Sequence, residues 1–294
     1  MAGYNYPTPR SLESARDFSE AVRFTILNYF HEQLGWSIAE CEERVKHELE
    51  RRTANSACTR LERDHLWSLS GAKVLDVGCG QGAALHELLV RGADAIGVEP
   101  GEEFAALARW RLRDSGLDEN RVQKASGEGL PFANNTFDYA LSLQVLEHVR
   151  DPESFLREVH RVLIPGGRFY LACENYLAFR EQHYRVPWLP LLPKQLGAAY
   201  LRAIGRKPEF LFEHVTYTTY PQVVMEAHRA GFRDETAAPL LQRLARPETI
   251  RSDRKRSLAR LIQRVPESDT LLRSALHARN TFAVGIKLYL VKPR

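Results

Sequence analysis

A short apolar run that ends in a glycine-rich loop constrains this chain more than any other feature. The run VLDVG covers residues 74–78, the loop GCGQG covers 78–82, and a helical pattern, AALHELLVR, follows at 83–91. Buried parallel strands read as continuous apolar runs, and glycine lets the backbone turn sharply and approach a ligand without a Cβ in the way. A strand, a glycine loop and a helix in this order predict the opening unit of a doubly wound α/β domain with a ligand at the loop.

The same alternation continues downstream. Asp151 and Pro152 are predicted to open a helix, as N-cap and first helical residue, that ends before the Pro-Gly-Gly turn at 165–167. Strands that alternate with helices predict a parallel sheet with helices on both faces. Further strands are predicted at 94–100, 122–126, 137–144, 168–174 and 281–292.

Helical spacing fills the N-terminal part of the chain. Apolar residues recur at helical intervals through 18–29, and Ser37 followed by Glu40 is typical of a capping box that opens a second helix, running to about residue 52. A third helix is predicted at about 57–66. We therefore divide the chain into an N-terminal helical segment (1–70), an α/β core (71–175), a first insertion (176–219), and the end of the core sheet with a basic helical insertion at about 240–280 (220–294).

Composition excludes several classes of function. A net charge of +4 over 294 residues is mild, which argues against nucleic acid as the main partner. The N-terminus lacks the pattern of a signal peptide and no run of about 18 apolar residues occurs, so we expect a cytoplasmic protein without a membrane span. The cysteines form no CxxC pair and predict neither disulfides nor a zinc site; they are Cys41, Cys58, Cys79 and Cys173.

The glycine loop by itself fits two kinds of cofactor. Gly78, Gly80 and Ala83 also satisfy the relaxed dinucleotide fingerprint, so a nicotinamide enzyme stays open at this point. Glu99 ends the next strand, where a carboxylate can accept hydrogen bonds from both hydroxyls of a ribose. Asp76 lies inside an apolar strand, and a buried carboxylate needs a partner, either the ammonium group of a ligand or nearby backbone N–H groups.

Three longer motifs together resemble the class I S-adenosylmethionine-dependent methyltransferase family. They are VLDVGCGQG, the VEP that follows it, and the block GLPFANNTFDYALSLQVLEHVRDPESFLREVHRVLIPGGRF, which together cover about residues 72–175. The resemblance implies an α/β fold with a doubly wound, Rossmann-like, seven-stranded mixed sheet. It also implies S-adenosyl-L-methionine as the cofactor, bound by the core, and a small-molecule acceptor. In this family, the N-terminal helical segment (1–70) would form a lid, and the first insertion (176–219) would form a cap over the acceptor.

The resemblance also assigns cofactor contacts residue by residue. Ser126 departs from the family, in which many members carry Asp to accept from the adenine amino group. The contacts implied are Asp76, Gly78 and Gly80 for the methionine moiety, Glu99 for the ribose, Gly127 and Glu128 beside the adenine, and Gln144 beside the sulfonium.

Methyl transfer to a hydroxyl needs a base close to the acceptor. His148, just after the fourth predicted core strand, is the leading candidate, and the alternative is that it only packs against its loop. No cluster of His, Asp and Glu at ligand spacing is visible, so no metal centre is expected. Gln144 stands where an amino-group methyltransferase would carry an Asn-Pro-Pro-Tyr type of motif, which disfavours that chemistry.

Other candidates for the pocket lie outside the core. We expect at least one of four insertion residues to face the pocket, with His183 and His214 as further candidates for catalysis and core packing as the alternative for each. An N-terminal tyrosine could contact the donor if the lid closes, or lie in a disordered tail. These residues are His183, Tyr184, His214 and Tyr217 in the insertion, and Tyr4 and Tyr6 at the N-terminus.

The two insertions combine apolar and basic residues. The first places Trp188 and Leu189 near Arg185, and the second carries a basic run that begins at Arg251 and ends at Arg264. Such surfaces suit a peripheral contact with an anionic membrane at its inner face, a phosphate-bearing acceptor, or merely a subdomain core with a solvated basic face. The first insertion resembles methyltransferases of the bacterial surface-polysaccharide type.

The acceptor is the least determined part of the sequence analysis. The preferred acceptor is a hydroxyl of a sugar or lipid-linked glycan. The alternatives are O- or C-methylation of a polyketide- or quinone-like metabolite, and a non-catalytic cofactor-binding partner subunit, which the intact loop, Asp76 and Glu99 disfavour. The sequence leaves the oligomeric state open.

Overall fold

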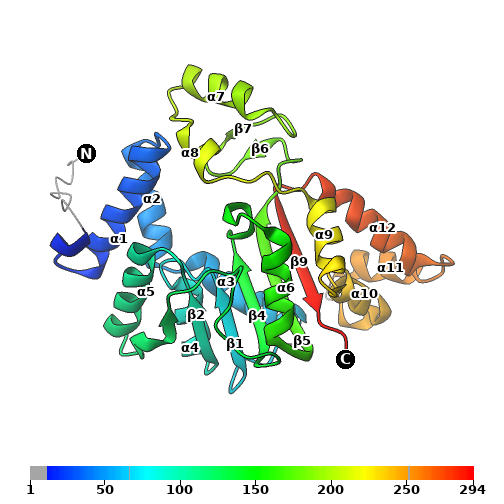
Figure 1. Cartoon of the computed structure of the whole chain (residues 1–294). Helices are drawn as coiled ribbons and strands as arrows, with labels where there is room; N and C mark the ends of the chain where they lie inside the picture. Colours follow the sequence, from blue (N-terminus) through cyan, green and yellow to red (C-terminus); the bar gives the residue numbers. More distant parts are fainter. Residues whose placement is uncertain (1–11, 66, 251) are drawn as a thin grey trace.

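A seven-stranded mixed sheet forms the centre of the computed structural model, which describes residues 12–65, 67–250 and 252–294 (Figure 1). The strand order is β3-β2-β1-β4-β5-β9-β8, in which the first five strands are parallel and β9 is antiparallel to both of its neighbours. This confirms the predicted fold class. The strands are β1 (Lys73–Val77), β2 (Asp94–Val98), β3 (Val122–Gln123), β4 (Phe137–Leu143), β5 (Leu163–Glu174), β8 (Arg233–Asp234) and β9 (Gly285–Val291).

Helices cover both faces of the sheet, because its central strands are apolar on both sides. One apolar core lies under α6 and α9, and a second lies under α3, α4 and α5 (Figure 1). The helices are α1 (Phe18–Ile26), α2 (Ile38–Leu49), α3 (Arg52–His65), α4 (Ala83–Val90), α5 (Glu102–Asp114), α6 (Pro152–Val162), α7 (Lys194–Ala203), α8 (Glu209–Glu213), α9 (Tyr220–Arg229), α10 (Ala238–Ala245), α11 (Asp253–Ile262) and α12 (Ser268–Thr281).

A third apolar core joins the N-terminal helices to the cap, although the two are far apart in sequence. Trp36, which follows the π-helical segment η2 (Leu27–Gln33), is 2% exposed and packs in the same cluster as Tyr184 of the cap. The indole N–H of Trp36 donates to the backbone carbonyl of His183 at 2.7 Å. The cap also contains a small hairpin of β6 (Arg180–Glu181) and β7 (Val186–Pro187). This packing fixes the cap above one end of the sheet (Figure 1).

Two helix starts follow the sequence predictions in detail. The side chain of Ser37 accepts from the backbone N–H of Glu40, and the side chain of Glu40 accepts from the backbone N–H of Ser37, which confirms the capping box. Asp151 caps α6 by accepting from the backbone N–H of Ser154, and Pro152 is the first helical residue, as expected.

The two largest errors in the predicted strand boundaries lie at the starts of β5 and β9, and β3 ends three residues earlier than predicted, at Gln123. The Pro-Gly-Gly turn lies inside β5 as an irregularity: Leu163 pairs with Phe137, and pairing resumes at Arg168 with Tyr139. The last strand was predicted to begin at residue 281, but α12 runs to Thr281. The amide of Asn175 donates to carbonyls at this helix end, including that of Ala283 at 2.7 Å, and so delays the strand.

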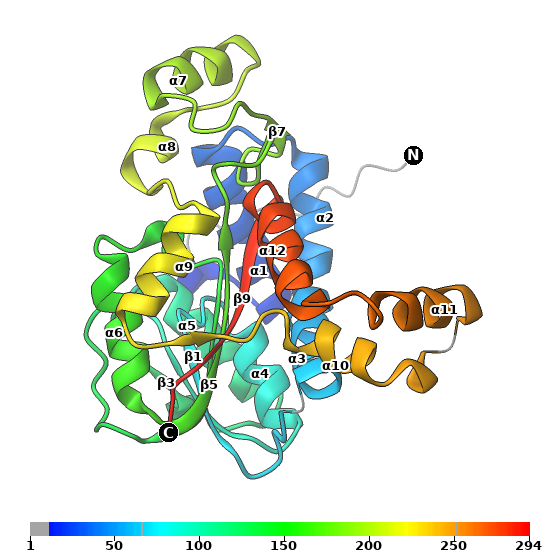
Figure 2. The same ribbon diagram turned by 90° about the vertical axis from the view of Figure 1, so that its right-hand side faces the viewer.

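The segment around α10 to α12 projects from the side of the sheet (Figure 2). It carries the predicted basic insertion, of which Arg251 lies outside the described residues. None of the helices in the described ranges combines the length and apolarity needed to cross a bilayer.

Candidate functional site

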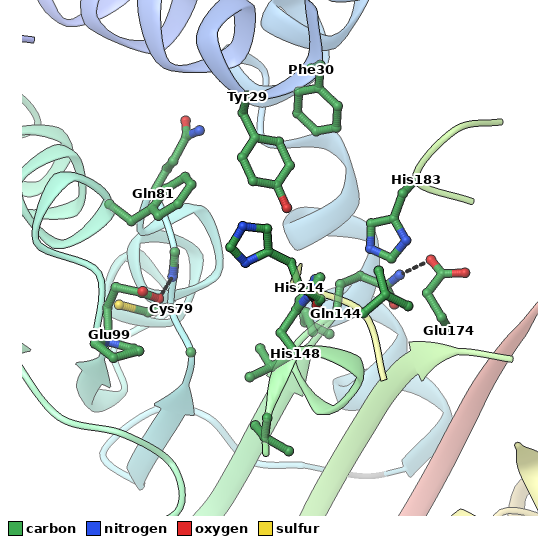
Figure 3. A pocket seen from close by; sticks show the side chains of 18 of the residues that line it. Tyr29, Phe30, Cys79, Gln81, Glu99, Gln144, His148, Glu174, His183 and His214 are labelled. Carbon is green, nitrogen blue, oxygen red and sulfur yellow. Dashed lines mark hydrogen bonds between the residues drawn. The ribbon is translucent and has the colours of Figure 1, made fainter. Parts of the chain in front are cut away.

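A cavity of about 1150 Å³ opens at the carboxyl ends of β1, β2, β4 and β5. Ligands of open α/β sheets bind at this edge, outside the carboxyl ends of the strands. Side chains from η2 and α2 form one wall, and loops of the cap form another, so that three parts of the chain surround one space (Figure 3).

Asp76 lies at the floor of the cavity and is 1% exposed. Its Oδ2 has no hydrogen-bond partner among the described residues. Burial, together with the nearby charge of Glu99, raises the pKa of Asp76 to about 7. A buried carboxylate oxygen without a partner is costly, and the ammonium group of an amino acid tail would supply the missing donors and charge.

Glu99 ends β2 and faces the same cavity. One carboxylate oxygen accepts from the backbone N–H of Gly80 at 3.0 Å and the other from Gly101 at 2.9 Å. Each oxygen keeps a lone pair, so the pair can still accept from two adjacent ribose hydroxyls. A Cβ on Gly80, whose φ is +52°, would meet no atom within 4 Å, which leaves room for a ligand against the loop.

The remaining expected cofactor residues also line the cavity, but their environments differ. Gly127 is required by packing, because a Cβ there would overlap Phe155 beneath it. The Glu128 carboxylate accepts from the backbone N–H of Asp151 at 2.7 Å and from the hydroxyl of Ser126 at 3.2 Å. Glu128 therefore ties the adenine-side loop to the start of α6. Together with Asp76 and Glu99, these contacts fit the group that the sequence motifs imply.

His148 lies in the short helical turn η4 (Leu146–His148) that follows β4. Its Nδ1 lies 2.6 Å from the backbone carbonyl oxygen of His214. Because a carbonyl can only accept, Nδ1 carries the proton and Nε2 keeps its lone pair. The ring is open to water inside the cavity but is surrounded by protein, and burial and the charge of His183 lower its pKa to about 4. His148 is therefore a neutral imidazole at physiological pH.

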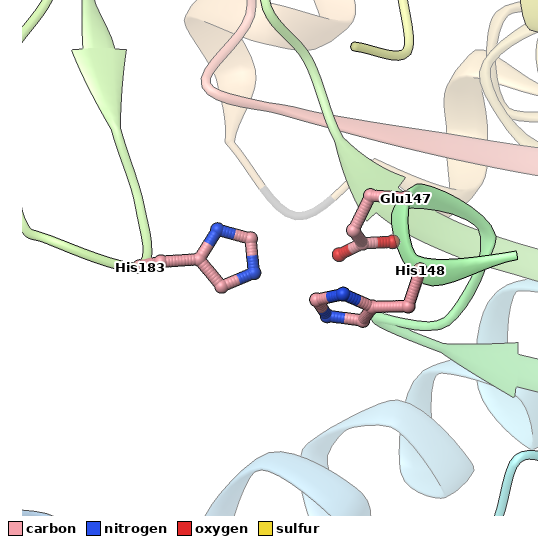
Figure 4. A group of neighbouring side chains, drawn as sticks. All are labelled: Glu147, His148 and His183. Carbon is pink, nitrogen blue, oxygen red and sulfur yellow. The ribbon is translucent and has the colours of Figure 1, made fainter. Parts of the chain in front are cut away.

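His183, in contrast to His148, is cationic. Its Nδ1 donates to Glu181 Oε1 at 2.9 Å, and Glu181 is 1% exposed. Burial opposes the charge on His183, but the hydrogen bond and the charge of Glu181, with the charges of Glu174 and Glu147, raise its pKa to about 9. The rings of His148 and His183 are 5.2 Å apart, so a neutral and a cationic imidazole face the same space (Figure 4).

Two further buried carboxylates lie behind the histidines. Glu147 is 0% exposed, and neither of its carboxylate oxygens has a partner among the residues described. Burial raises its pKa to about 7. Glu174, at the end of β5, accepts from the amide of Gln144 at 2.7 Å, and burial raises its pKa to about 8. Gln144 adopts a φ of +59°, a strained conformation of the kind that clusters at functional sites.

Glu147, His148 and His183 each place a ligand atom within 4.8 Å of the other two (Figure 4). Three such donors could hold a divalent cation. These three residues are not at ligand spacing in the sequence, because His183 comes from the cap, far along the chain from the other two. The absence of a metal centre stays a prediction.

The remaining residues predicted to face the pocket fall into two groups, those that line the cavity and those that pack in the cap. His183 and His214 line the cavity, although His214 contacts His148 through its backbone. Tyr184 is fully buried and its hydroxyl donates to the carbonyl of Lys207, whereas Tyr217 stacks on Tyr176. Both tyrosines therefore pack in the cap core. Tyr4 and Tyr6 lie outside the described residues.

Sequence reasoning missed several cavity residues. Glu174 carried the same signal as Glu99, a carboxylate that ends an apolar strand, and could have been found. Tyr29 was assigned to a helical core, but it lies on the wall of the cavity, and its ring is 5.2 Å from that of Phe210. No local signal marked Glu181, because its role depends on the folded cap.

Comparison with known proteins adds independent information. A family profile described as a methyltransferase domain matches residues 75–171. The chain is 31% identical over 200 residues to a ubiquinone biosynthesis O-methyltransferase of Pseudomonas entomophila, covering 62% of this chain and 80% of that one. It is 37% identical over 112 residues to the protein of the same name from Pseudomonas aeruginosa, covering 38% of this chain and only 48% of the relative.

A solved structure resembles the whole chain. The phosphoethanolamine N-methyltransferase 2 of Haemonchus contortus, in complex with S-adenosyl-L-methionine, matches with a TM-score of 0.51 and 17% identity, covering 100% of this chain and 62% of that one. At this identity, the likeness is one of fold.

Proposed function

The chain belongs to the class I S-adenosylmethionine-dependent methyltransferases, and we propose that it methylates a hydroxyl of a quinone-like aromatic acceptor. The family membership confirms the methyltransferase activity and the cofactor expected from the motifs. It also sets aside the nicotinamide dinucleotide and the non-catalytic subunit as alternatives.

The proposed acceptor differs from the one that the sequence analysis preferred. The comparisons give no support to a sugar or lipid-linked glycan, whereas the relatives are named as O-methyltransferases of ubiquinone biosynthesis. The aromatic walls of the cavity also favour a flat acceptor: Tyr29, Phe30 and Trp36 line it together with Phe104.

The placement of two histidines is the observation that carries the proposal: their rings are 5.2 Å apart at the cavity, with His148 against a backbone carbonyl and His183 against the buried carboxylate of Glu181. A base with a pKa of about 4 is weak, so His148 needs an acidic hydroxyl. A phenol, with a pKa of about 10, is far more acidic than a sugar hydroxyl. The imidazolium of His183 lowers the pKa of a neighbouring phenol further, because an opposite charge favours the phenolate.

The roles of this chain's residues follow from these positions. The bound cofactor supplies a methyl group already activated on a sulfonium. Asp76 and Glu99 line the cavity and would hold the donor's ammonium and ribose. His183 stabilises the acceptor oxygen as its charge develops, and His148 Nε2 accepts the proton. The cap and η2 restrict the access of water to the pair.

Direct assay of methyl transfer tests the proposal. Purified protein with labelled donor should methylate catechol-type or hydroquinone-type substrates and should leave sugar hydroxyls unmodified. Mass spectrometry of the product should place the methyl group on oxygen. Transfer to glycans alone, or to ring carbon alone, would reject the proposed acceptor.

A second version of the mechanism is favoured by the unpartnered carboxylate of Glu147. A divalent cation held by Glu147, His148 and His183 would replace the two histidines as the group that acidifies the phenol. Dialysis against a chelator separates the two versions. Retained activity supports the metal-free base, and a loss that added Mg²⁺ or Zn²⁺ restores supports the cation.

We also propose a peripheral membrane contact through the surface of α11. Leu258 and Leu261 are 55% and 60% exposed on this helix, and the basic residues around them are exposed as well. Exposed apolar side chains among cations suit an anionic lipid surface. The basic residues are Arg254, Lys255, Arg260 and Arg264.

A further inference from the structure

We propose that Arg185 and Arg44 form a binding subsite for an anionic group, a carboxylate or a phosphate, carried by the methyl acceptor. Both arginines line the cavity, one from the β6–β7 turn of the cap and the other from α2. The inference rests on the proposed function in one respect, namely that this cavity receives the acceptor.

A continuous row of aromatic rings joins this pair to the two histidines. His183 lies 5.4 Å from Phe210, which lies 5.2 Å from Tyr29. Tyr29 in turn lies 4.9 Å from Phe30, and Phe30 lies 4.5 Å from Trp36. Of these rings, Tyr29, Phe30 and Trp36 line the cavity, so an aromatic acceptor with its hydroxyl at the histidines would lie against them.

The arginines stand at the far end of the row. The guanidinium of Arg185 lies 4.2 Å from the centroid of Trp36, and that of Arg44 lies 5.7 Å from the centroid of Phe30. Arginine stacked on a ring keeps its N–H groups free to bind carboxylate or phosphate.

The charges of these arginines are poorly compensated by the protein. Over the ranges that the structure covers, Arg185 forms neither an ion pair nor a side-chain hydrogen bond. Arg44 pairs with Glu48 only at 3.8 Å, and Glu48 binds Arg111 more closely, at 2.9 Å. Burial lowers the pKa of Arg185, and the like charge of Arg44 lowers it further, against the opposing effect of Glu43 and Glu40. An anion between the two guanidiniums would relieve this repulsion.

Arg185 is also held rigidly in an unfavourable backbone conformation. Its φ is +56°, in the left-handed region that L-residues other than Asn and Asp rarely adopt. On the preceding residues, Tyr184 N donates to Glu181 at 2.6 Å, and His183 O accepts from Trp36 at 2.7 Å. A strained residue that faces a cavity and is fixed by its neighbours is typical of a preorganised binding group.

Calorimetry of acceptor-like probes that bind to the full chain loaded with S-adenosylhomocysteine tests the subsite. This measurement does not depend on turnover. Two pairs of probes differ only by an anionic group: 3,4-dihydroxybenzoate against catechol, and farnesyl phosphate against farnesol. A charged probe should bind about tenfold or more tightly than its neutral partner, as charge-assisted hydrogen bonds predict. Preference in the first pair identifies an aromatic acid, and preference in the second a lipid phosphate.

Arg185→Asn removes the charge while tolerating the positive φ, and should abolish the preference without changing the affinity for S-adenosylhomocysteine. Arg202→Asn, on the exposed face of α7 and outside the cavity, should keep the preference. Equal binding within both pairs would overturn the subsite. A loss of S-adenosylhomocysteine affinity in Arg185→Asn would assign the pair to the donor's carboxylate and overturn it too. If the preference holds but no hydroxyl is methylated, only the proposed function fails.

Discussion

The donor end of the cavity is built from short segments that follow one another along the chain, whereas the acceptor end combines segments that are far apart. Asp76, Gly80 and Glu99 lie within 24 consecutive residues. At the acceptor end, Trp36 and His183 are in contact across 147 positions. The first arrangement needs only two strands and a loop, but the second needs the cap to be docked.

The two ends also handle charge differently. At the donor end, one oxygen of Asp76 has no hydrogen-bond partner in the described part of the chain, and the proposed function completes the site with the ammonium group of the donor. At the acceptor end, Glu181 already holds His183 as a cation, and burial beside that cation keeps His148 neutral. In the proposed mechanism, the donor end therefore binds a cationic group, whereas the acceptor end moves a proton.

The largest expected effect is on kcat, and it distinguishes the acceptor end from the donor end. His148→Ala should lower kcat by about 10²–10⁴ by removing the base, while the Kd for S-adenosylhomocysteine stays within about twofold, because the donor end is untouched. Steady-state kinetics and calorimetry measure both values. His228→Ala, at an exposed position of α9, serves as the control and should change neither. A kcat of His148→Ala close to the parent value would remove this residue from the mechanism.

The next effect is on stability, and it concerns the contact between the glycine loop of the donor end and the segment that leads to His148 at the acceptor end. Gly78 has a φ of +75°, and a Cβ there would lie 2.8 Å from Cγ1 of Val145, three residues before His148. Gly78→Ala should therefore lower the free energy of unfolding by roughly 2–5 kcal/mol, from the backbone conformation and the overlap. Urea denaturation measures this change.

Two variants sharpen the same test. The double variant Gly78→Ala/Val145→Ala should regain the part of the free energy of unfolding that the overlap removed. It should still lack the part that the positive φ removed. Gly129→Ala, where a Cβ would meet nothing within 4 Å, should have little effect. Equal stabilities for Gly78→Ala and Gly129→Ala would show that the glycine is not required by packing.

A smaller effect concerns the pH dependence of the donor end. Below its pKa of about 7, Asp76 carries a proton that competes with the donor's ammonium group. Affinity for S-adenosylhomocysteine should therefore rise about tenfold per pH unit up to about pH 7, and then level off. Calorimetry from pH 5.5 to 8 checks this slope. In Asp76→Asn, which has no proton to release, affinity should be lower and the slope flat, and a slope that persists would exclude Asp76 as its source.

The smallest effect concerns a surface outside both ends. Each of Arg254→Gln, Lys255→Gln and Arg260→Gln should weaken binding to vesicles that contain phosphatidylglycerol by about fivefold, since one cation near an anionic surface contributes about 1 kcal/mol. Sedimentation with vesicles measures the binding, and pure phosphatidylcholine vesicles are the control. Equal binding to both kinds of vesicle would leave α11 as a solvated helix.

Much of the fold followed from local patterns. The capping box at Ser37, the N-cap at Asp151 and the glycine loop each depend on neighbouring residues, and each forms as predicted. The end of α12 was missed because the amide that caps it belongs to Asn175, more than a hundred positions earlier. Boundaries that depend on distant partners leave no local signal.

The sequence by itself determined the α/β order and the glycine loop, because a strand, a turn and a helix are specified by adjacent side chains. Only the tertiary structure decided the charge states at the acceptor end. His148 and His183 are the same residue type, but His148 is neutral because it is buried beside the charge of His183, and His183 is cationic because a buried carboxylate accepts its hydrogen bond. A pKa depends on burial and on neighbours in space, and the folded cap supplies both.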